Sequence, residues 1–229
     1  MKLTLSMVVV AVLAIIGALA ATRGGSDDTA GGPTDRPTAG QQSEPGTSTG
    51  APSTGGAPSD PPLVRDDSPR LSEGSEAVFV EFLDFECPSC AGVFGVLEEM
   101  RAEYGDRIGF VVRYVPLHAN SMNSFRAAEA AGEQGRYEDM YVMLFERQTQ
   151  WAGAEDDSFF FAYAEELGLD AEQFERDFSS DEVDQRIQQS VTDANELGIQ
   201  GTPTFFLDGE EFSPETVQDL ENAFRDAVE

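Results

Sequence analysis

Two cysteines separated by two residues are the side chains of this chain best suited to chemistry. The stretch DFECPSC, residues 84–90, holds the only two cysteines among 229 residues. Such a pair can be a structural disulfide, part of a metal site or a redox centre. A disulfide between Cys87 and Cys90 would close a very small loop and stabilise the fold little. A structural zinc site needs four ligands, and beyond the cysteines the chain has one histidine, His118. We therefore favour redox chemistry and expect no metal and no other cofactor.

The residues around the cysteines predict a buried strand followed directly by a helix. Val78 to Phe85 is nearly all apolar and β-favouring, like a central strand covered on both faces. Pro88 suits a first helical turn, where backbone N–H groups and the helix dipole stabilise a thiolate. Apolar residues then recur at helical spacing, at Phe94, Leu97, Met100 and Tyr104. We predict that Cys87 is an exposed nucleophile and that Cys90, one turn into the helix, is the resolving thiol.

The remainder of the folded part predicts a helical block between two β-containing halves. A second strand is expected from Ile108 to Val115, and helices are expected over Ser121–Gln134, Tyr137–Gln150, Ser158–Leu167, Ala171–Phe178 and Glu182–Leu197. Thr204–Leu207 then predicts a strand, Asp208-Gly209 a tight turn into a short partner strand, and Ser213-Pro214 the cap and start of a last helix. The expected order is βαβ, a helical insertion over about 119–198, then ββα.

Two motifs in this order resemble the DsbA-like branch of the thioredoxin superfamily. FLDFECPSC is followed more than 100 residues later by GIQGTPTFFLDG. The resemblance implies an α/β thioredoxin fold with a helical insertion and the activity of a protein thiol-disulfide oxidoreductase of bacterial cell envelopes. It also implies a cis bond between Thr202 and Pro203 that faces the cysteines, with Thr202 offering backbone hydrogen bonds to a bound peptide. We assign Pro88 and Ser89 to the same substrate-binding surface.

A third candidate catalytic residue is Glu81, six positions before Cys87. The resemblance implies a buried acid here that relays the proton of the resolving cysteine. A carboxyl group inside an apolar strand has a raised pKa and can act as such a base. The alternative is a register that leaves Glu81 at a solvated edge. We expect His118 to be a loop or capping residue. Trp151 and Phe159 to Phe161 are expected to pack the insertion, with a surface for unfolded substrate as the alternative.

The residue between the cysteines bears on how oxidising the pair is. The DsbA turn reads Cys-Pro-His-Cys, so a histidine stands there where this chain has Ser89. Without that imidazolium, and with Asp84 and Glu86 nearby, we expect the Cys87 thiolate to be less stabilised. The predicted reduction potential is therefore less oxidising than the value of about −120 mV for DsbA.

The N-terminal 75 residues predict an export segment and a tether. LTLSMVVVAVLAIIGALAA follows a single lysine and contains no acidic residue, so residues 1–21 are expected to be a signal peptide or a transmembrane anchor. Residues 22–75 are rich in Gly, Pro, Ser, Thr and Asp and predict a disordered linker before a domain at 76–229. The expected location is extracytoplasmic, either anchored by the N-terminal segment or secreted after cleavage.

The charge of the chain excludes one class of partner. The formal net charge is −29, and residues 76–229 hold 35 acidic residues against 9 arginines. Nucleic acid binding is excluded because phosphate recognition needs a basic surface. The acidic residues are interpreted as a solvated face.

Three activities stay open for the cysteine pair. The first is an oxidase that forms disulfides in cysteine-containing exported polypeptides and is restored by a membrane redox partner. The second is a dedicated reductase or isomerase. The third is a redox-inert peptide-binding or chaperone module on the same fold.

Overall fold

A strand, a helix and a second strand build the first half of the fold in the computed structural model, which describes residues 62–154 and 156–229. Strand β1 (Ala77–Leu83) ends just before the cysteines, helix α1 (Pro88–Tyr104) follows, and strand β2 (Ile108–Tyr114) pairs with β1 in parallel. This is the predicted strand-to-helix arrangement. The cysteine pair therefore lies at the carboxyl end of the strand that forms the centre of the sheet.

The second half of the fold adds two strands and a helix. Strand β3 (Thr204–Leu207) pairs antiparallel with β1 and with β4 (Glu210–Phe212), which gives the sheet order β2-β1-β3-β4. Asp208 and Gly209 both have positive φ, as a two-residue hairpin turn requires. The predicted cap of the last helix was wrong. Helix α8 (Val217–Ala227) begins after Thr216, since Thr216 and the Asp219 side chain form a reciprocal capping box.

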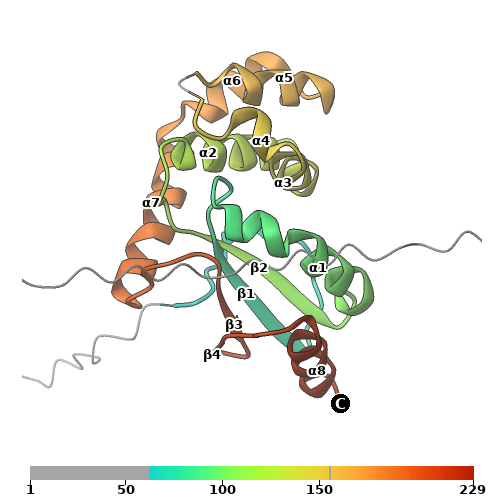
Figure 1. Cartoon of the computed structure of the whole chain (residues 1–229). Helices are drawn as coiled ribbons and strands as arrows, with labels where there is room; N and C mark the ends of the chain where they lie inside the picture. Colours follow the sequence, from blue (N-terminus) through green and yellow to red (C-terminus); the bar gives the residue numbers. More distant parts are fainter. Residues whose placement is uncertain (1–61, 155) are drawn as a thin grey trace, which may run out of the picture. The chain divides into compact units, whose positions relative to one another are not determined.

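The helical insertion lies between β2 and β3 and supports the end of the sheet where the cysteines are. Its helices are α2 (Ser121–Gly132), α3 (Tyr137–Glu146), α4 (Gln148–Trp151), α5 (Ser158–Glu166), α6 (Ala171–Phe178) and α7 (Asp181–Glu196). The helix expected over Tyr137–Gln150 is divided at Arg147. Figure 1 shows α2 to α6 gathered above the sheet, while α7 runs back down one side of it toward β3. Trp151 and Phe160 are fully buried against each other, as the packing interpretation predicted.

Alternating side chains of the strands pack against helices on both faces of the sheet. One face places Phe79, Phe110 and Phe205 against α1 and α8, where Phe224 completes the aromatic cluster. On the other face a second cluster, which includes Val80, Phe82, Val111 and Phe206, packs against Ala194 of α7. Because both faces are covered, the two central strands are almost continuously apolar.

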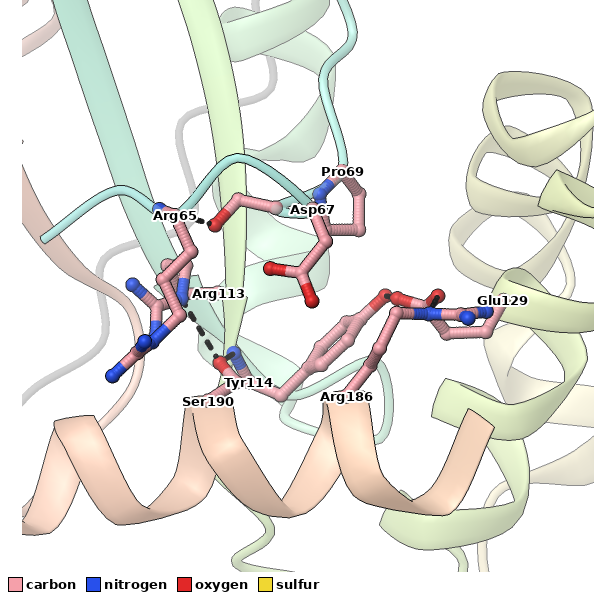
Figure 2. Close-up of a pocket in the computed structure, with 9 residues that line it drawn as sticks. Arg65, Asp67, Pro69, Arg113, Tyr114, Glu129, Arg186 and Ser190 are labelled. Atoms are coloured by element: carbon pink, nitrogen blue, oxygen red, sulfur yellow. Dashed lines mark hydrogen bonds and ion pairs between the residues drawn. The ribbon is translucent and has the colours of Figure 1, made fainter. Parts of the chain in front are cut away.

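Residues 62–71, which we call the strap, belong to the folded unit. The N–H of Leu71 donates to the Phe110 carbonyl (2.9 Å), and the N–H of Val112 donates to the Pro69 carbonyl (2.9 Å). Figure 2 shows the strap from Arg65 to Pro69 lying beside β2 and above α7. The predicted linker boundary at residue 75 is therefore corrected to a position no later than residue 62. The predicted N-terminal anchor lies outside the described residues, and no helix within them is long and apolar enough to cross a bilayer.

A buried arginine joins the strap, the sheet and α7. Arg113 of β2 is 1% exposed, forms an ion pair with Asp193 of α7 and donates to the carbonyl groups of Pro62 and Leu63. Arg65 of the strap donates to both carboxylate oxygens of Asp193, at 2.6 and 2.7 Å. Burial alone would raise the pKa of Asp193, but hydrogen bonds from Arg65 and Arg113 outweigh it and lower the pKa to about 2. Three segments that are distant in sequence are thus held by one carboxylate.

We predict that Asp193→Ala lowers the free energy of unfolding by about 3–5 kcal/mol, because it leaves the Arg113 guanidinium buried without its counter-charge. Asp184→Ala is the matched control on the same helix, since Asp184 pairs with Arg126 at the surface. It should cost no more than about 1 kcal/mol. Urea unfolding of both variants measures the difference, and equal losses would contradict the structural role of the buried pair.

Candidate active site

Cys87 and Cys90 occupy the N-terminal turn of α1 in different surroundings. Cys87 is the N-cap residue; its N–H donates to the Asp84 carbonyl (3.0 Å), and its carbonyl accepts from the N–H of Ala91 (3.2 Å). Cys87 is 7% exposed and Cys90 is 1% exposed. The nucleophile is therefore less exposed than predicted, although it remains the more accessible of the two thiols. Pro88 and Ser89, between the cysteines, are both exposed.

The loop before β3 closes over Cys87. The bond between Thr202 and Pro203 is cis, as the resemblance implied. The Cys87 thiol donates to the Thr202 carbonyl at 3.4 Å. The Thr202 hydroxyl is buried and has no hydrogen-bond partner among the described residues. This hydroxyl is therefore a donor available to the sulfur once Cys87 ionises.

The surroundings of Cys87 favour its thiolate. Burial alone would raise its pKa, but the Thr202 hydroxyl, which can donate to the sulfur once it ionises, and the backbone N–H groups of Cys90 and Ser89 favour the thiolate more strongly and lower the pKa. The backbone donors are the free N–H groups of the first turn of α1, which make a helix N-terminus a site for anions. Cys87 is thus a thiol prepared to act as nucleophile or leaving group.

Cys90 and Glu81 lie behind Cys87 and hold their protons more tightly than usual. Burial, followed by the charge of Glu81, raises the pKa of Cys90 far above its ordinary range. Glu81 is 3% exposed in β1, which rules out the solvated-edge alternative for this residue. Burial, with added repulsion from Glu98 and Cys87, raises the pKa of Glu81 to about 8. The two thiols therefore differ strongly in acidity. At neutral pH the Glu81 carboxyl group, which influences Cys90, is protonated.

Asp84 is buried behind the cysteine turn, and sequence reasoning did not assign it a structural role. One carboxylate oxygen accepts the N–H of Glu86 (3.0 Å). The other accepts the N–H of Leu117 (2.9 Å), the Ser121 hydroxyl (2.7 Å) and Nδ1 of His118 (2.7 Å). The carboxylate therefore ties the cysteine turn to the start of the helical insertion.

Glu86 makes a second connection of this kind. Its carboxylate accepts the backbone N–H groups of Asn120 (2.6 Å) and Gly153 (2.7 Å). Gln148 of α4 adds a third, because its amide donates to the carbonyl groups of Phe85 (2.7 Å) and Cys87 (3.0 Å). Asp84 and Glu86, which were expected to oppose the Cys87 thiolate, are thus carboxylates with fixed hydrogen-bond donors. In the sequence, the position of Asp84 and Glu86 within an apolar stretch could have indicated this arrangement, because buried carboxylates require hydrogen-bond donors.

An apolar cavity of about 230 Å³ adjoins the cysteine helix. It is lined by Gly92, Val93 and Val96 of α1, by Phe205 of β3 and by the segment from Pro214 to Val217. The cavity begins two residues beyond Cys90 in the chain. It offers an apolar surface on the same helix as the two cysteines.

Comparison with known proteins agrees with this geometry. The family model described as Thioredoxin matches residues 72–226. A solved structure, the thioredoxin-like oxidoreductase from Silicibacter pomeroyi DSS-3, is 30% identical, with 75% of this chain and 98% of that chain covered at a TM-score of 0.62. The thiol-disulfide exchange protein alpha-DsbA2 from Wolbachia pipientis is 22% identical, with coverage of 69% and 86% at a TM-score of 0.61. At that identity, the second likeness concerns the fold alone.

Curated relatives carry a different kind of name. The Na(+)/H(+) antiporter NhaA of Herminiimonas arsenicoxydans is 37% identical over 152 residues, which is 66% of this chain and 23% of that protein. The Na(+)/H(+) antiporter NhaA 1 of Mycolicibacterium gilvum is 37% identical over 137 residues, or 57% of this chain and 21% of that protein. The chain therefore spans less than a quarter of the length of these relatives.

We predict that Glu81→Gln flattens the decline of stability with rising pH. The folded protein keeps the Glu81 proton up to about pH 8, while the unfolded chain releases it near the ordinary value of 4.5. The folded state thus binds more protons in this window, and its stability should fall as pH rises, by at most about 1.4 kcal/mol per pH unit. Urea unfolding between these pH values measures the effect. Glu211→Gln on exposed β4 is the control, and identical slopes in wild type and Glu81→Gln would contradict the prediction.

We predict that Thr202→Val raises the pKa of Cys87 by about one unit, because one donor to the thiolate is lost while the side-chain shape is kept. The pH dependence of thiolate ultraviolet absorbance measures this pKa. Thr204→Val is the control, since the Thr204 hydroxyl donates to the Gly201 carbonyl (2.9 Å). A Cys87 pKa unchanged by Thr202→Val, or moved equally by both variants, would show that the hydroxyl does not reach the sulfur.

Proposed function

This chain belongs to the thioredoxin family and has a DsbA-like fold, and on that premise we propose that it is an extracytoplasmic thiol-disulfide oxidoreductase that forms disulfides in exported polypeptides. The observation that carries the proposal is the asymmetry of the cysteine pair. The pKa of Cys87 is lowered, whereas that of Cys90 is raised beside a buried carboxyl group. A structural disulfide does not require two thiols of different acidity, whereas a disulfide exchanger depends on that difference.

Oxidation of a substrate dithiol proceeds by two exchanges at the pair. A substrate thiolate attacks Cys87 in the Cys87–Cys90 disulfide, forms a mixed disulfide and releases the Cys90 sulfur. A second substrate thiolate then attacks the substrate sulfur of that mixed disulfide and releases Cys87 as a thiolate. The substrate loses two electrons, and the cysteine pair gains them. The lowered pKa of Cys87 makes it the better leaving group in the second exchange.

Glu81 supplies the proton that the first exchange needs. The released Cys90 sulfur is buried and holds a proton strongly, so leaving it as a thiolate would be costly. Glu81, with a pKa of about 8, carries a proton at neutral pH and lies in the same buried region. Transfer from Glu81 to Cys90 completes the step without exposing either group to water.

An extended substrate has a surface beside Cys87. Thr202, which precedes the cis Pro203, contacts the nucleophile, and exposed Pro88 and Ser89 follow it in the chain. The apolar cavity between α1 and the segment before α8 would accept an apolar side chain of an unfolded polypeptide. The acidic surface of the domain supports a protein substrate rather than a nucleic acid.

The N-terminal sequence and the pair itself support the remaining parts of the proposal. The apolar leader supports an extracytoplasmic domain that is anchored or secreted. Each turnover leaves Cys87 and Cys90 reduced, so a membrane redox partner must accept two electrons to restore the disulfide. The proposal takes nothing from the name Na(+)/H(+) antiporter, because the likeness covers less than a quarter of the proteins that carry it.

A dedicated reductase is the second candidate, and one observation favours it. Because the pKa of Cys87 is lowered, its thiolate could attack a disulfide in a substrate, after which Cys90 would release the reduced product. In that direction Glu81 must accept the proton of Cys90. With a pKa of about 8, it is mostly protonated at neutral pH, and this favours the oxidase direction.

We predict that Cys90→Ser, expressed as the full chain in its native host, accumulates mixed disulfides with substrates through Cys87. The resolving thiol is absent, so the attached substrate cannot be released by Cys90. Reductant-sensitive adducts on a non-reducing gel, identified by mass spectrometry, are the measurement. Cys87→Ser is the control and should carry none.

The adducts distinguish the candidates. Many exported proteins with several cysteines would support the oxidase, and a single repeated partner would support the dedicated reductase. An absence of adducts would count against thiol exchange and in favour of a peptide-binding module.

A further inference from the structure

The single histidine of the chain is bound to the buried carboxylate behind the cysteine turn. His118 lies between β2 and α2, with its side chain 35% exposed. Its Nδ1 is 2.7 Å from Oδ2 of Asp84, whose side chain is fully buried. Because a carboxylate can only accept, the imidazole donates in this bond. One edge of the ring thus faces a buried charge while the side chain retains contact with solvent.

His118 differs in kind from the other donors to Asp84. The N–H groups of Glu86 and Leu117 and the hydroxyl of Ser121 are neutral. Among these four donors, His118 is the one that can carry a positive charge. A buried carboxylate is costly without a compensating charge or several donors, so the histidine adds what the neutral donors lack.

Asp84 is in turn in direct contact with the cysteine turn. Its carbonyl accepts the N–H of Cys87 at 3.0 Å. The Asp84 backbone also acts to lower the pKa of Cys90, against the larger rise caused by burial. A change in the charge or orientation of Asp84 would therefore reach both cysteines without any contact between them and His118.

We propose that His118 is a positioning residue that sets the acidity of Cys87 through Asp84. Its ring N–H holds the carboxylate against the start of the insertion. In its protonated form the ring also offsets a negative charge that would otherwise oppose the Cys87 thiolate. The only imidazole of this chain thus acts from behind the cysteine turn, whereas the exposed position directly before Cys90 is occupied by Ser89. The proposal deepens the proposed thiol-exchange function, on which it rests.

The test compares His118→Ala and His118→Asn with the wild-type full chain. In His118→Ala we expect the pKa of Cys87 to rise and the equilibrium constant for oxidation of glutathione by the protein to fall about tenfold. An asparagine amide can stand in for the Nδ1 donor without its charge, so His118→Asn should fall between wild type and His118→Ala. Thiolate absorbance and the glutathione equilibrium are the two readouts.

A double-mutant cycle with Asp84→Asn tests the route. If His118 acts through Asp84, adding His118→Ala to Asp84→Asn should leave the Cys87 pKa within about 0.3 unit, since coupled neighbours are non-additive. A full His118→Ala effect in that background would overturn the proposal. So would a loss of stability in His118→Ala with both redox readouts unchanged, because that is the result of a purely structural residue.

A third variant keeps the proposal testable even where Asp84→Asn does not fold. Ser121→Ala removes a neutral donor to the same carboxylate oxygen. It should raise the pKa of Cys87 less than His118→Ala does, and a larger rise would overturn the role given to the histidine charge. The glutathione equilibrium uses no protein substrate, so its outcome is independent of whether the Cys90→Ser trap finds clients.

Discussion

The burial of two carboxylates beside the cysteines is the constraint on which the rest of the site depends. Asp84 and Glu86 follow the central strand directly, where the chain enters the interior between sheet and insertion. Ionised groups there must find donors, and the helical insertion supplies them from Leu117, His118, Asn120, Ser121 and Gly153. The insertion is therefore part of the machinery that shapes the cysteine turn.

The same principle operates on the opposite face of the sheet. Arg113 is a cation within β2, and it is satisfied by Asp193 of α7 and by carbonyl groups of the strap. The strap, which was assigned to the linker from its sequence, is thereby held against the domain. Stacking of the Arg113 guanidinium over the Phe82 ring, at 5.4 Å from its centroid, adds to the packing of this face. Buried charges on both faces thus connect parts of the chain that hydrophobic packing alone would leave loosely placed.

The chemistry of the pair follows from where each sulfur lies along one helical turn. Cys87 is at the cap, within reach of free backbone N–H groups and of Thr202. Cys90 is one turn deeper, where burial and Glu81 oppose its ionisation. Opposite shifts in pKa thus arise from three residues of separation, because the helix N-terminus is an anion site and the interior behind it is not.

The amino-acid sequence by itself determined the local part of this protein. Pro88 at the first position of α1, the strand Thr204–Leu207 and the turn at Asp208-Gly209 were predicted correctly, because their signals lie within a few neighbouring residues. The cysteine spacing and the Thr-Pro motif likewise identified the fold. The tertiary structure alone decided which groups satisfy Asp84, Glu86 and Arg113, how far Cys87 is covered, and that the strap is folded. Those outcomes depend on contacts between residues distant in the chain, and such contacts leave no periodic pattern or local spacing in the sequence.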